Sequence, residues 1–384
     1  MTIPNFTSTG SKRPEALFGD LTGGPQTMIR SEGCRLWDHD GNQYIDMIMA
    51  LGAVALGYAH PRVVAATTNA VSAGTVGSLP PTLELAVAER LAAAIPGAES
   101  VRFFKSGAEA VAAAVRIARV YTGRERVITC GYHGWLDWCQ SEPGVPHPVT
   151  QLRTEIPFND IAALNRAVGD DEPVAAIVLE PVVDGPPDVE WLDTARRLAE
   201  GSGAVLVFDE IKTAFRIATG GAAERFGVVP HLMVVGKGLG NGFPIAATCG
   251  SKDVMDAATK TWISSTLATE FVSLAAALAV LDVFGDGKTV EHLNVIGSQF
   301  MHGLDKLARD HPKVFQAVRG IPQMCYLQCT DSSVSQSVAV GAARRGVLVK
   351  LSAYNFVSLA HSDHVIEGVL QQIDQVATEL EATC

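Results

Sequence analysis

The sequence predicts an α/β protein: a large domain with a mostly parallel sheet flanked by helices, and a smaller α+β domain. The chain has 384 residues, which is more than one typical domain contains. In its middle, short apolar runs alternate with helical stretches, the pattern of parallel strands buried on both faces. After about residue 270 this alternation ends, and a long apolar helix precedes shorter strands and helices.

The domain boundaries are expected where these patterns change. Residues 1–70 are predicted to form an N-terminal arm and part of the smaller domain, 71–270 the large domain, and 271–384 the rest of the smaller domain. Residues 1–30 are rich in Gly, Pro, Ser and Thr, which indicates a loosely structured arm suited to packing on a partner subunit.

The first regular elements that the sequence predicts are a hairpin and a helix. Apolar residues alternate over 34–49, and Asp40-Gly41 is a favoured hairpin turn. Thr82 then precedes the helical run LELAVAERLAAAIP as its candidate N-cap, and Pro96 marks its end.

A series of strand–helix units follows. The strand VRFF (101–104) leads through a short turn into the Ala-rich helix AEAVAAAVRIARVY, which Gly123 closes. Later apolar runs have the character of buried strands: RVITC, VAAIVLE, AVLVFDE, HLMVVG and PIAATCG. Helical stretches such as DIAALNRAV and VEWLDTARRLAE separate several of them.

Composition excludes several classes of function. The 30 basic and 41 acidic residues give a net charge of −11, and no basic run favours nucleic acid or an anionic membrane. Seven cysteines, scattered and odd in number, favour a reduced pool over disulfides or a zinc site. The N-terminus has no apolar signal region and no run is long enough to span a membrane, so we expect a cytoplasmic protein.

An acid and a lysine end two successive apolar strands. AVLVFD ends at Asp209, and the next strand ends in Gly-Lys-Gly at Lys237. A lysine between glycines is usually a solvated turn, but one at the end of a buried strand has a lowered pKa and is a better nucleophile and base. This arrangement suits pyridoxal phosphate (PLP), which a lysine holds as a Schiff base while an acid pairs with its protonated pyridine nitrogen.

A candidate phosphate site precedes the Ala-rich helix. Ser106, Gly107 and Ala108 form the turn into its N-terminus, where free N–H groups and the helix dipole favour an anion. Ser-Gly before a helix is also often only a cap. The pattern therefore indicates a phosphate site only in combination with the lysine and the acid.

These motifs belong to a longer resemblance. Matching blocks run in order from LWDHDGNQYIDM through GYAHP, VRFFKSGAEA, GYHGW, VLEPV, VLVFDEIKTAFR and VVGKGLGNGFP to FVSLAHSD. Over almost its whole length the chain resembles the class III aminotransferases of fold-type I, and most of all their glutamate-1-semialdehyde aminomutase branch. The resemblance implies the fold-type I PLP transferase architecture and PLP as cofactor.

The resemblance also implies which residues hold the cofactor ring. Lys237 matches the Schiff-base lysine, Asp209 the acid at the pyridine nitrogen, and Ile211 the residue against one ring face. Tyr132 of GYHGW matches the ring placed over the pyridine, and its neighbour His133 is a further candidate, although an aromatic residue before His-Gly is also common in protein cores.

Two more candidates follow from the family pattern. Glu180 of VLEPV resembles a hydrogen-bonding support near the cofactor. Thr266 resembles the threonine that reaches the phosphate of the neighbouring subunit, which implies a homodimer with a shared active site. The chain departs from the pattern just afterwards, because Glu270 stands where related enzymes tend to have asparagine.

The function predicted from this set is a PLP-dependent transaminase that moves an amino group from a donor such as glutamate to an oxo acceptor. The stretch over 352–355, shorter than in the aminomutases, argues against a strict glutamate-1-semialdehyde assignment. The lack of an arginine assigned to a substrate carboxylate favours an oxo-sugar or cyclitol acceptor. An intramolecular aminomutase, a racemase or epimerase, and an elimination enzyme stay open, since they share these motifs. Retention of the lysine, the aspartate and the phosphate turn argues against a degenerate binding module.

Overall fold

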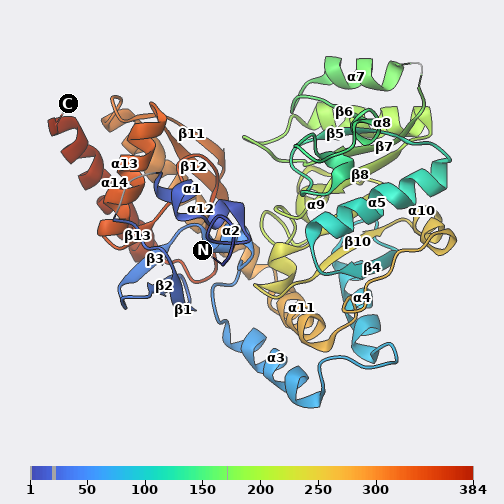
Figure 1. Ribbon diagram of the computed structural model, residues 1–384, viewed down its shortest axis with the longest axis horizontal. Helices are drawn as coiled ribbons and strands as arrows, with labels where there is room; N and C mark the ends of the chain where they lie inside the picture. Colours follow the sequence, from blue (N-terminus) through green and yellow to red (C-terminus); the bar gives the residue numbers. More distant parts are fainter. Residues whose placement is uncertain (1, 20–22, 171, 384) are drawn as a thin grey trace. The chain divides into compact units, whose positions relative to one another are not determined.

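The computed structural model describes residues 2–19, 23–170 and 172–383 (Figure 1). The chain forms two compact units: a larger one, Pro61–Val290, and a smaller one that combines Met1–His60 with Glu291–Cys384.

The larger unit contains a sheet that has seven strands among the described residues. In chain order they are β4 (Ser100–Phe104), β5 (Arg126–Cys130), β6 (Arg153–Glu155), β7 (Val174–Leu179), β8 (Val205–Asp209), β9 (Leu232–Val235) and β10 (Ala246–Gly250). Across the sheet their order is β4-β10-β9-β8-β7-β5-β6. β6, β5, β7, β8 and β9 pair in parallel, whereas β10 is antiparallel to β9 and to β4. β4 therefore runs in the same direction as β9.

Helices lie beside this sheet and between its strands in sequence (Figure 1). They are α3 (Pro61–Ala73), α4 (Thr82–Ala94), α5 (Gly107–Thr122), α6 (His147–Thr150), α7 (Ile161–Gly169), α8 (Val189–Ser202), α9 (Gly221–Phe226), α10 (Lys252–Met255) and α11 (Phe271–Phe284), with short 3-10 turns η2 (Asp137–Cys139), η3 (Lys237–Gly240) and η4 (Asp256–Lys260). Val178, Val207 and Val234 pack in one cluster with the apolar side of α5. Ile177 and Phe208, which point to the other face because side chains alternate along a strand, are also buried. The sheet is thus covered on both faces, and the predicted α/β architecture is confirmed.

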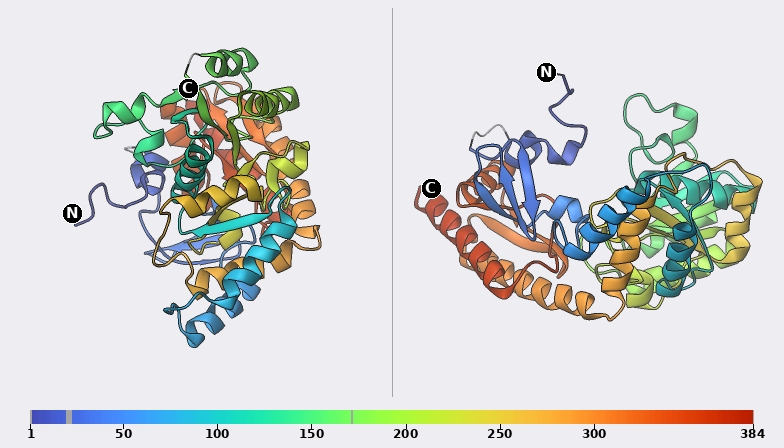
Figure 2. Two further views of the ribbon diagram at one scale, coloured as in Figure 1. Left: turned by 90° about the vertical axis from the view of Figure 1, so that its right-hand side faces the viewer. Right: turned by 90° about the horizontal axis from the view of Figure 1, so that it is seen from below.

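The boundaries of the larger unit differ from those expected. It begins at Pro61 rather than 71 and ends at Val290 rather than 270. The reason is that α3 and α11 pack against each other, and α11 also packs on α4 (Figures 1 and 2). The long apolar helix after residue 270 therefore completes the larger unit instead of opening the smaller one.

The described residues of the smaller unit form two sheets and several helices. Its strands are β1 (Met28–Glu32), β2 (Arg35–Asp38), β3 (Gln43–Asp46) and β13 (Val347–Leu348) in one sheet, and β11 (Phe315–Ile321), β12 (Met324–Cys329) and β14 (Asn355–Phe356) in the other. Its helices are η1 (Gly10–Lys12), α1 (Pro14–Phe18), α2 (Met49–Gly52), α13 (Ser332–Arg344) and α14 (Asp363–Thr383); α12 (Lys288–Asp310) begins in the larger unit and continues here. The predicted hairpin is the antiparallel pair β2–β3, with Gly41 at a φ of +85° in its turn.

Two local predictions were wrong. Thr82 is the first residue of α4 rather than its cap, and Pro81 occupies the N-cap position without a side-chain hydrogen bond. The described part of the N-terminal arm is also more regular than expected. It contains α1, which starts at Pro14, a residue whose fixed φ suits the first helical turn.

Candidate cofactor-binding site

Five segments of the larger unit bring the predicted site residues, apart from Thr266, to one edge of the sheet. They follow the carboxyl ends of β4, β5, β7, β8 and β9, which all run in the same direction. The ends of parallel strands form the usual binding edge of an open α/β sheet. Residues that are far apart in the sequence therefore share one region.

Asp209, the last residue of β8, is buried against a histidine. Its Oδ2 lies 2.9 Å from Nδ1 of His133, which is buried as well. Its Oδ1 accepts the N–H of Ile211 at 3.2 Å. A carboxylate held away from water needs a cationic or hydrogen-bonding partner, and the protonated nitrogen of a pyridine ring is such a partner.

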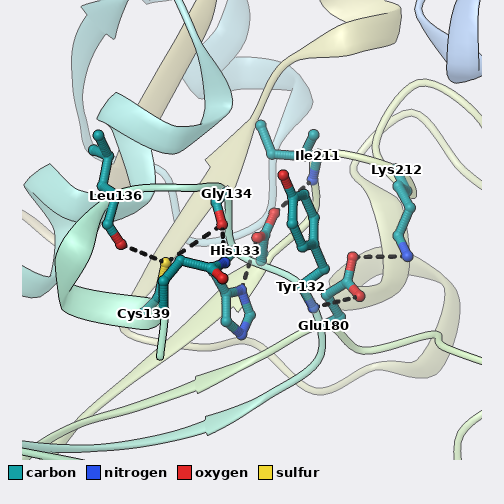
Figure 3. Close-up of polar contacts among 10 residues, drawn as sticks. Tyr132, His133, Gly134, Leu136, Cys139, Glu180, Ile211 and Lys212 are labelled. Carbon is teal, nitrogen blue, oxygen red and sulfur yellow. Dashed lines mark hydrogen bonds and ion pairs between the residues drawn. The ribbon is translucent and has the colours of Figure 1, made fainter. Parts of the chain in front are cut away.

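The loop after β5 is anchored by a second acid. Glu180, directly after β7, accepts the N–H of Tyr132 at 3.1 Å through Oε2, and its Oε1 lies 2.8 Å from Nζ of Lys212 (Figure 3). Gly131 has a φ of +100°, and a Cβ there would approach the Glu180 carboxylate to 2.6 Å. The backbone of this loop can therefore lie on Glu180 only because residue 131 is glycine. The Tyr132 side chain remains exposed, with 66% of its surface accessible.

Lys237 starts the 3-10 turn η3 directly after β9 and Gly236, with a φ of +42° that is uncommon for a residue with a side chain. Its side chain is only partly exposed. Burial is the largest cause that lowers the pKa of its ammonium, to about 8, and the positive charge of Lys212 adds to the effect. The carboxylates of Glu180 and Asp209 act in the opposite direction. Near neutral pH, a larger fraction of this amine is therefore unprotonated than in an ordinary lysine.

The turn into α5 has the local geometry of a helix N-terminus that can bind an anion. Ser106 is the N-cap: its Oγ accepts the N–H of Glu109 at 3.2 Å, and the Glu109 carboxylate accepts the N–H of Ser106 at 2.9 Å. The N–H groups of Gly107 and Ala108 lie in the first turn, which offers them no intrahelical acceptor. A Cβ on Gly107 would come within 2.9 Å of Ile211, so glycine lets the helix end lie against that side chain.

Thr266 is not brought together with the other candidates. It lies exposed in the turn between Ser265 and Thr269, before α11. The residue that departs from the family pattern, Glu270, caps α11 by accepting the N–H groups of Val272 and Ser273, at 2.7 and 2.9 Å. The same carboxylate lies 2.7 Å from Nζ of Lys105, next to the phosphate turn.

Two charged groups of this region were not predicted as site residues. Lys212, directly after Ile211, lies on Glu180, and Arg216 is buried nearby, with its Nε donating to the backbone oxygen of Lys212 at 3.1 Å. Lys212 could have been found from the sequence, because it is a cationic residue directly after the buried Asp-Glu-Ile run. Glu210 is buried and accepts N–H groups at the start of α9, which is a structural role.

A polar cavity of about 490 Å³ lies elsewhere, in the smaller unit. Its lining includes Tyr326, Ser335, Gln336 and Lys350, and contains none of the predicted site residues. The chemistry of the sheet edge, rather than this cavity, therefore identifies the candidate site.

The site fits PLP on three counts: an amine at the end of a buried strand, a buried acid beside it, and a helix N-terminus shaped by glycine for an anion. Together with the sheet, these features define a PLP-dependent transferase of fold-type I. Residues 23–381 match the aminotransferase class-III family, and the chain belongs to that family. The predicted class of enzyme, a PLP-dependent class III aminotransferase, and its cofactor are confirmed.

Individual proteins similar to this chain are consistent with this family assignment. Glutamate-1-semialdehyde 2,1-aminomutase of Rhodopirellula baltica is 37% identical over 324 residues, covering 78% of this chain and 73% of that protein. The FumI protein of Sphingopyxis sp. MTA144, solved as its PLP internal aldimine, superposes with a TM-score of 0.92 at 26% identity, over 97% of this chain and 92% of that one. Ornithine aminotransferase of Toxoplasma gondii superposes with a TM-score of 0.85 at 25% identity, over 93% of this chain and 91% of that one.

Among the described residues, no helix is long and apolar enough to cross a membrane.

Proposed function

We propose that this enzyme transfers an amino group from a small amino donor such as glutamate to an oxo acceptor, with an oxo-sugar or cyclitol as the acceptor class. The observation that carries the proposal is the meeting of Lys237 with Asp209 at one sheet edge, beside the N-terminus of α5. When bound, PLP supplies an electron sink that stabilises negative charge on the substrate carbon next to the nitrogen. The other roles proposed below belong to residues of this chain.

Each predicted residue at the ring has a defined role in this proposal. Lys237 attaches the cofactor and, once substrate displaces it, its free amine carries a proton to and from the substrate carbon. Asp209 holds the proton on the pyridine nitrogen, and His133 orients Asp209 through the 2.9 Å contact. Ile211 and Tyr132 bound the two faces of the ring.

The phosphate end has its own set of residues. Ser106, Gly107 and Ala108 bind the phosphate through the first turn of α5. Glu180 holds the backbone of the loop that carries Tyr132, through the hydrogen bond to its N–H.

We further infer that Thr266 serves the site of a second copy, in a homodimer. The support is its exposed turn, which is accompanied by exposed apolar side chains: Trp262 has 84% of its surface accessible and Leu267 has 52%. Exposed apolar surface of this kind marks contact sites. Sedimentation of the PLP-loaded protein tests this inference: a dimer at assay concentration supports it, and a fully active monomer contradicts it.

An intramolecular aminomutase is the second candidate, and the 37% identity to a glutamate-1-semialdehyde 2,1-aminomutase favours it. A racemase, an epimerase or an elimination enzyme would use the same residues around the cofactor. The candidate reactions differ in whether the first product leaves while its amino group stays on the cofactor.

A half-reaction separates the candidates. The PLP-loaded enzyme is mixed with glutamate, glutamine, alanine and amino sugars in turn, while the cofactor absorbance and the oxo product are followed. Stoichiometric discharge by one donor, reversed by an oxo acceptor, is the result expected of a transaminase. If no donor discharges the cofactor while a single substrate is converted to an isomer or eliminated product, the transaminase proposal is wrong.

A further inference from the structure

An ion pair lies beside the proposed phosphate turn. Nζ of Lys105 is 2.7 Å from Oε1 of Glu270, and the two side chains have 18% and 14% of their surface accessible. Lys105 directly precedes Ser106, the N-cap of α5, whereas Glu270 is itself the N-cap of α11. The pair therefore joins the first turns of two helices at the proposed phosphate end of the site.

Glu270 is held in place as an ionised carboxylate. Its Oε2 accepts the N–H of Val272 at 2.7 Å, and its Oε1 accepts the N–H of Ser273 at 2.9 Å. Burial acts to raise its pKa, but the hydrogen bonds from Lys105 and Ser273 outweigh burial, so the pKa lies below its usual value. A fixed negative charge is thus present beside the phosphate turn at neutral pH.

A second carboxylate borders the same turn. Oε2 of Glu109, in the first turn of α5, accepts the N–H groups of Lys105 and Ser106, at 3.2 and 2.9 Å. An anion bound at this helix end is therefore flanked by two negative charges, which repel it. The dipole of α5 attracts the anion, but it is equivalent to only roughly half an elementary charge. The ammonium of Lys105, in contact with Glu270, supplies further positive charge at this place.

Stability alone is a weak explanation for the pair. Removing two charges from water is costly, and a largely buried ion pair is weak evidence for a stabilising role. The helix end that Glu270 caps could be capped by a neutral serine or asparagine, which would need no counter-charge. The position of the pair, directly before the phosphate turn, favours a role toward the anion.

We propose that Lys105 is a positioning residue of the cofactor site: its ammonium, fixed on Glu270, cancels the charge of that carboxylate, so that the turn into α5 can accept the phosphate of the cofactor. This inference rests on the proposed phosphate site. In this role Lys105 forms and breaks no covalent bond. It changes the affinity for a phosphate-bearing cofactor and leaves the chemistry at the ring unaffected.

The two members of the pair make predictions of opposite sign. In Lys105→Met the Glu270 charge is left unopposed, so the affinity for PLP should fall by about tenfold. In Glu270→Gln the ammonium is freed while an oxygen remains to cap α11, so the affinity for PLP should rise by about threefold. The double variant loses both charges and should bind PLP within about twofold of the wild type. Lys105→Arg keeps the charge and should also stay near the wild type.

Titration of the full chain with two related compounds measures these changes. The protein freed of cofactor is titrated with PLP and, separately, with pyridoxal, which lacks the phosphate, and binding is followed by absorbance. The affinity for pyridoxal should be the same in all variants. Added salt should narrow the difference between Lys105→Met and the wild type, because it screens the repulsion. The matched control is Lys252→Met, which removes one positive charge from an exposed pair with Asp256 in the same unit.

A purely structural role for the pair would give a different result. Weaker PLP binding in both single variants and in the double variant, with pyridoxal affected equally, would overturn the inference. So would a Glu270→Gln variant that binds PLP no more tightly than the wild type. If Lys105→Met does not yield folded protein, Glu270→Gln and the double variant decide, since neither leaves an unpaired carboxylate. A wild type that binds pyridoxal as tightly as PLP would instead contradict the proposed phosphate site itself.

Discussion

The two ends of the proposed cofactor site are built in different ways. The ring end consists of Lys237, Asp209 and Glu180, which lie at or just after the ends of buried parallel strands; in the same chain, His133 contacts Asp209 and Lys212 contacts Glu180. The phosphate end combines the first turn of α5 with an exposed segment that carries Thr266. The ring end is therefore complete in a single chain, whereas the phosphate end leaves a role for a second copy. Variants at the ring end should mainly lower the turnover number, whereas variants at the phosphate end should mainly weaken cofactor binding.

The largest loss is expected for Lys237→Ala. Without the amine, the protein loses both its attachment point for the cofactor and its proton carrier, so turnover should fall by about 10⁴-fold or more. Steady-state assay with excess PLP measures this. Lys252→Ala, at an exposed pair, is the control and should retain wild-type turnover. Comparable activity in the two variants would mean that another lysine reacts.

Asp209→Ala is expected to have the next largest effect, a loss of about 10²- to 10³-fold in turnover together with weaker PLP binding. The change removes the charge that keeps the pyridine nitrogen protonated and leaves buried Nδ1 of His133 without its acceptor. Single-turnover kinetics with deuterated substrate separates proton removal from binding. Near-normal proton removal would show that a different acid serves the ring.

Much of the ring end could be predicted from the sequence, because apolar runs that end in Asp209 and Lys237 predict strands, and parallel strands end at one edge. The partner of Glu180 could not be predicted, since no local pattern links Lys212 to a residue on a neighbouring strand end. The assignment of α11 to the larger unit was missed for a similar reason: its packing on α3 depends on distant apolar surfaces rather than on its own sequence.

The pH dependence of cofactor capture should reflect the ring end. The pKa of Lys237 is lowered to about 8, so its reactive free amine decreases tenfold for each unit below that value. The rate at which the cofactor-free protein takes up PLP should rise with pH and level off above about 8. Stopped-flow absorbance measures this rate. A rate that keeps rising to about pH 10, the range of an ordinary lysine, would contradict the lowered pKa.

The smallest effect is expected for Thr266→Ala. If the exposed turn reaches the phosphate of a second copy, the loss of one hydroxyl hydrogen bond to a charged group should weaken PLP binding by about tenfold and change turnover at saturating PLP little. Equilibrium dialysis of the dimer measures its affinity for PLP. Thr259→Ala, whose hydroxyl donates only to a local carbonyl, is the matched control. Equal PLP affinity in both variants would remove Thr266 from the phosphate site.

Borohydride reduction followed by peptide mapping tests the central claim most directly. The PLP-loaded wild-type chain is reduced, digested and analysed by mass spectrometry, with Lys237→Ala treated in the same way. We predict that the reduced cofactor is found on the peptide that carries Lys237, and that the variant carries none. Reduced cofactor on another lysine of the wild type, or a variant that still acquires it at a stoichiometric level, would contradict the account.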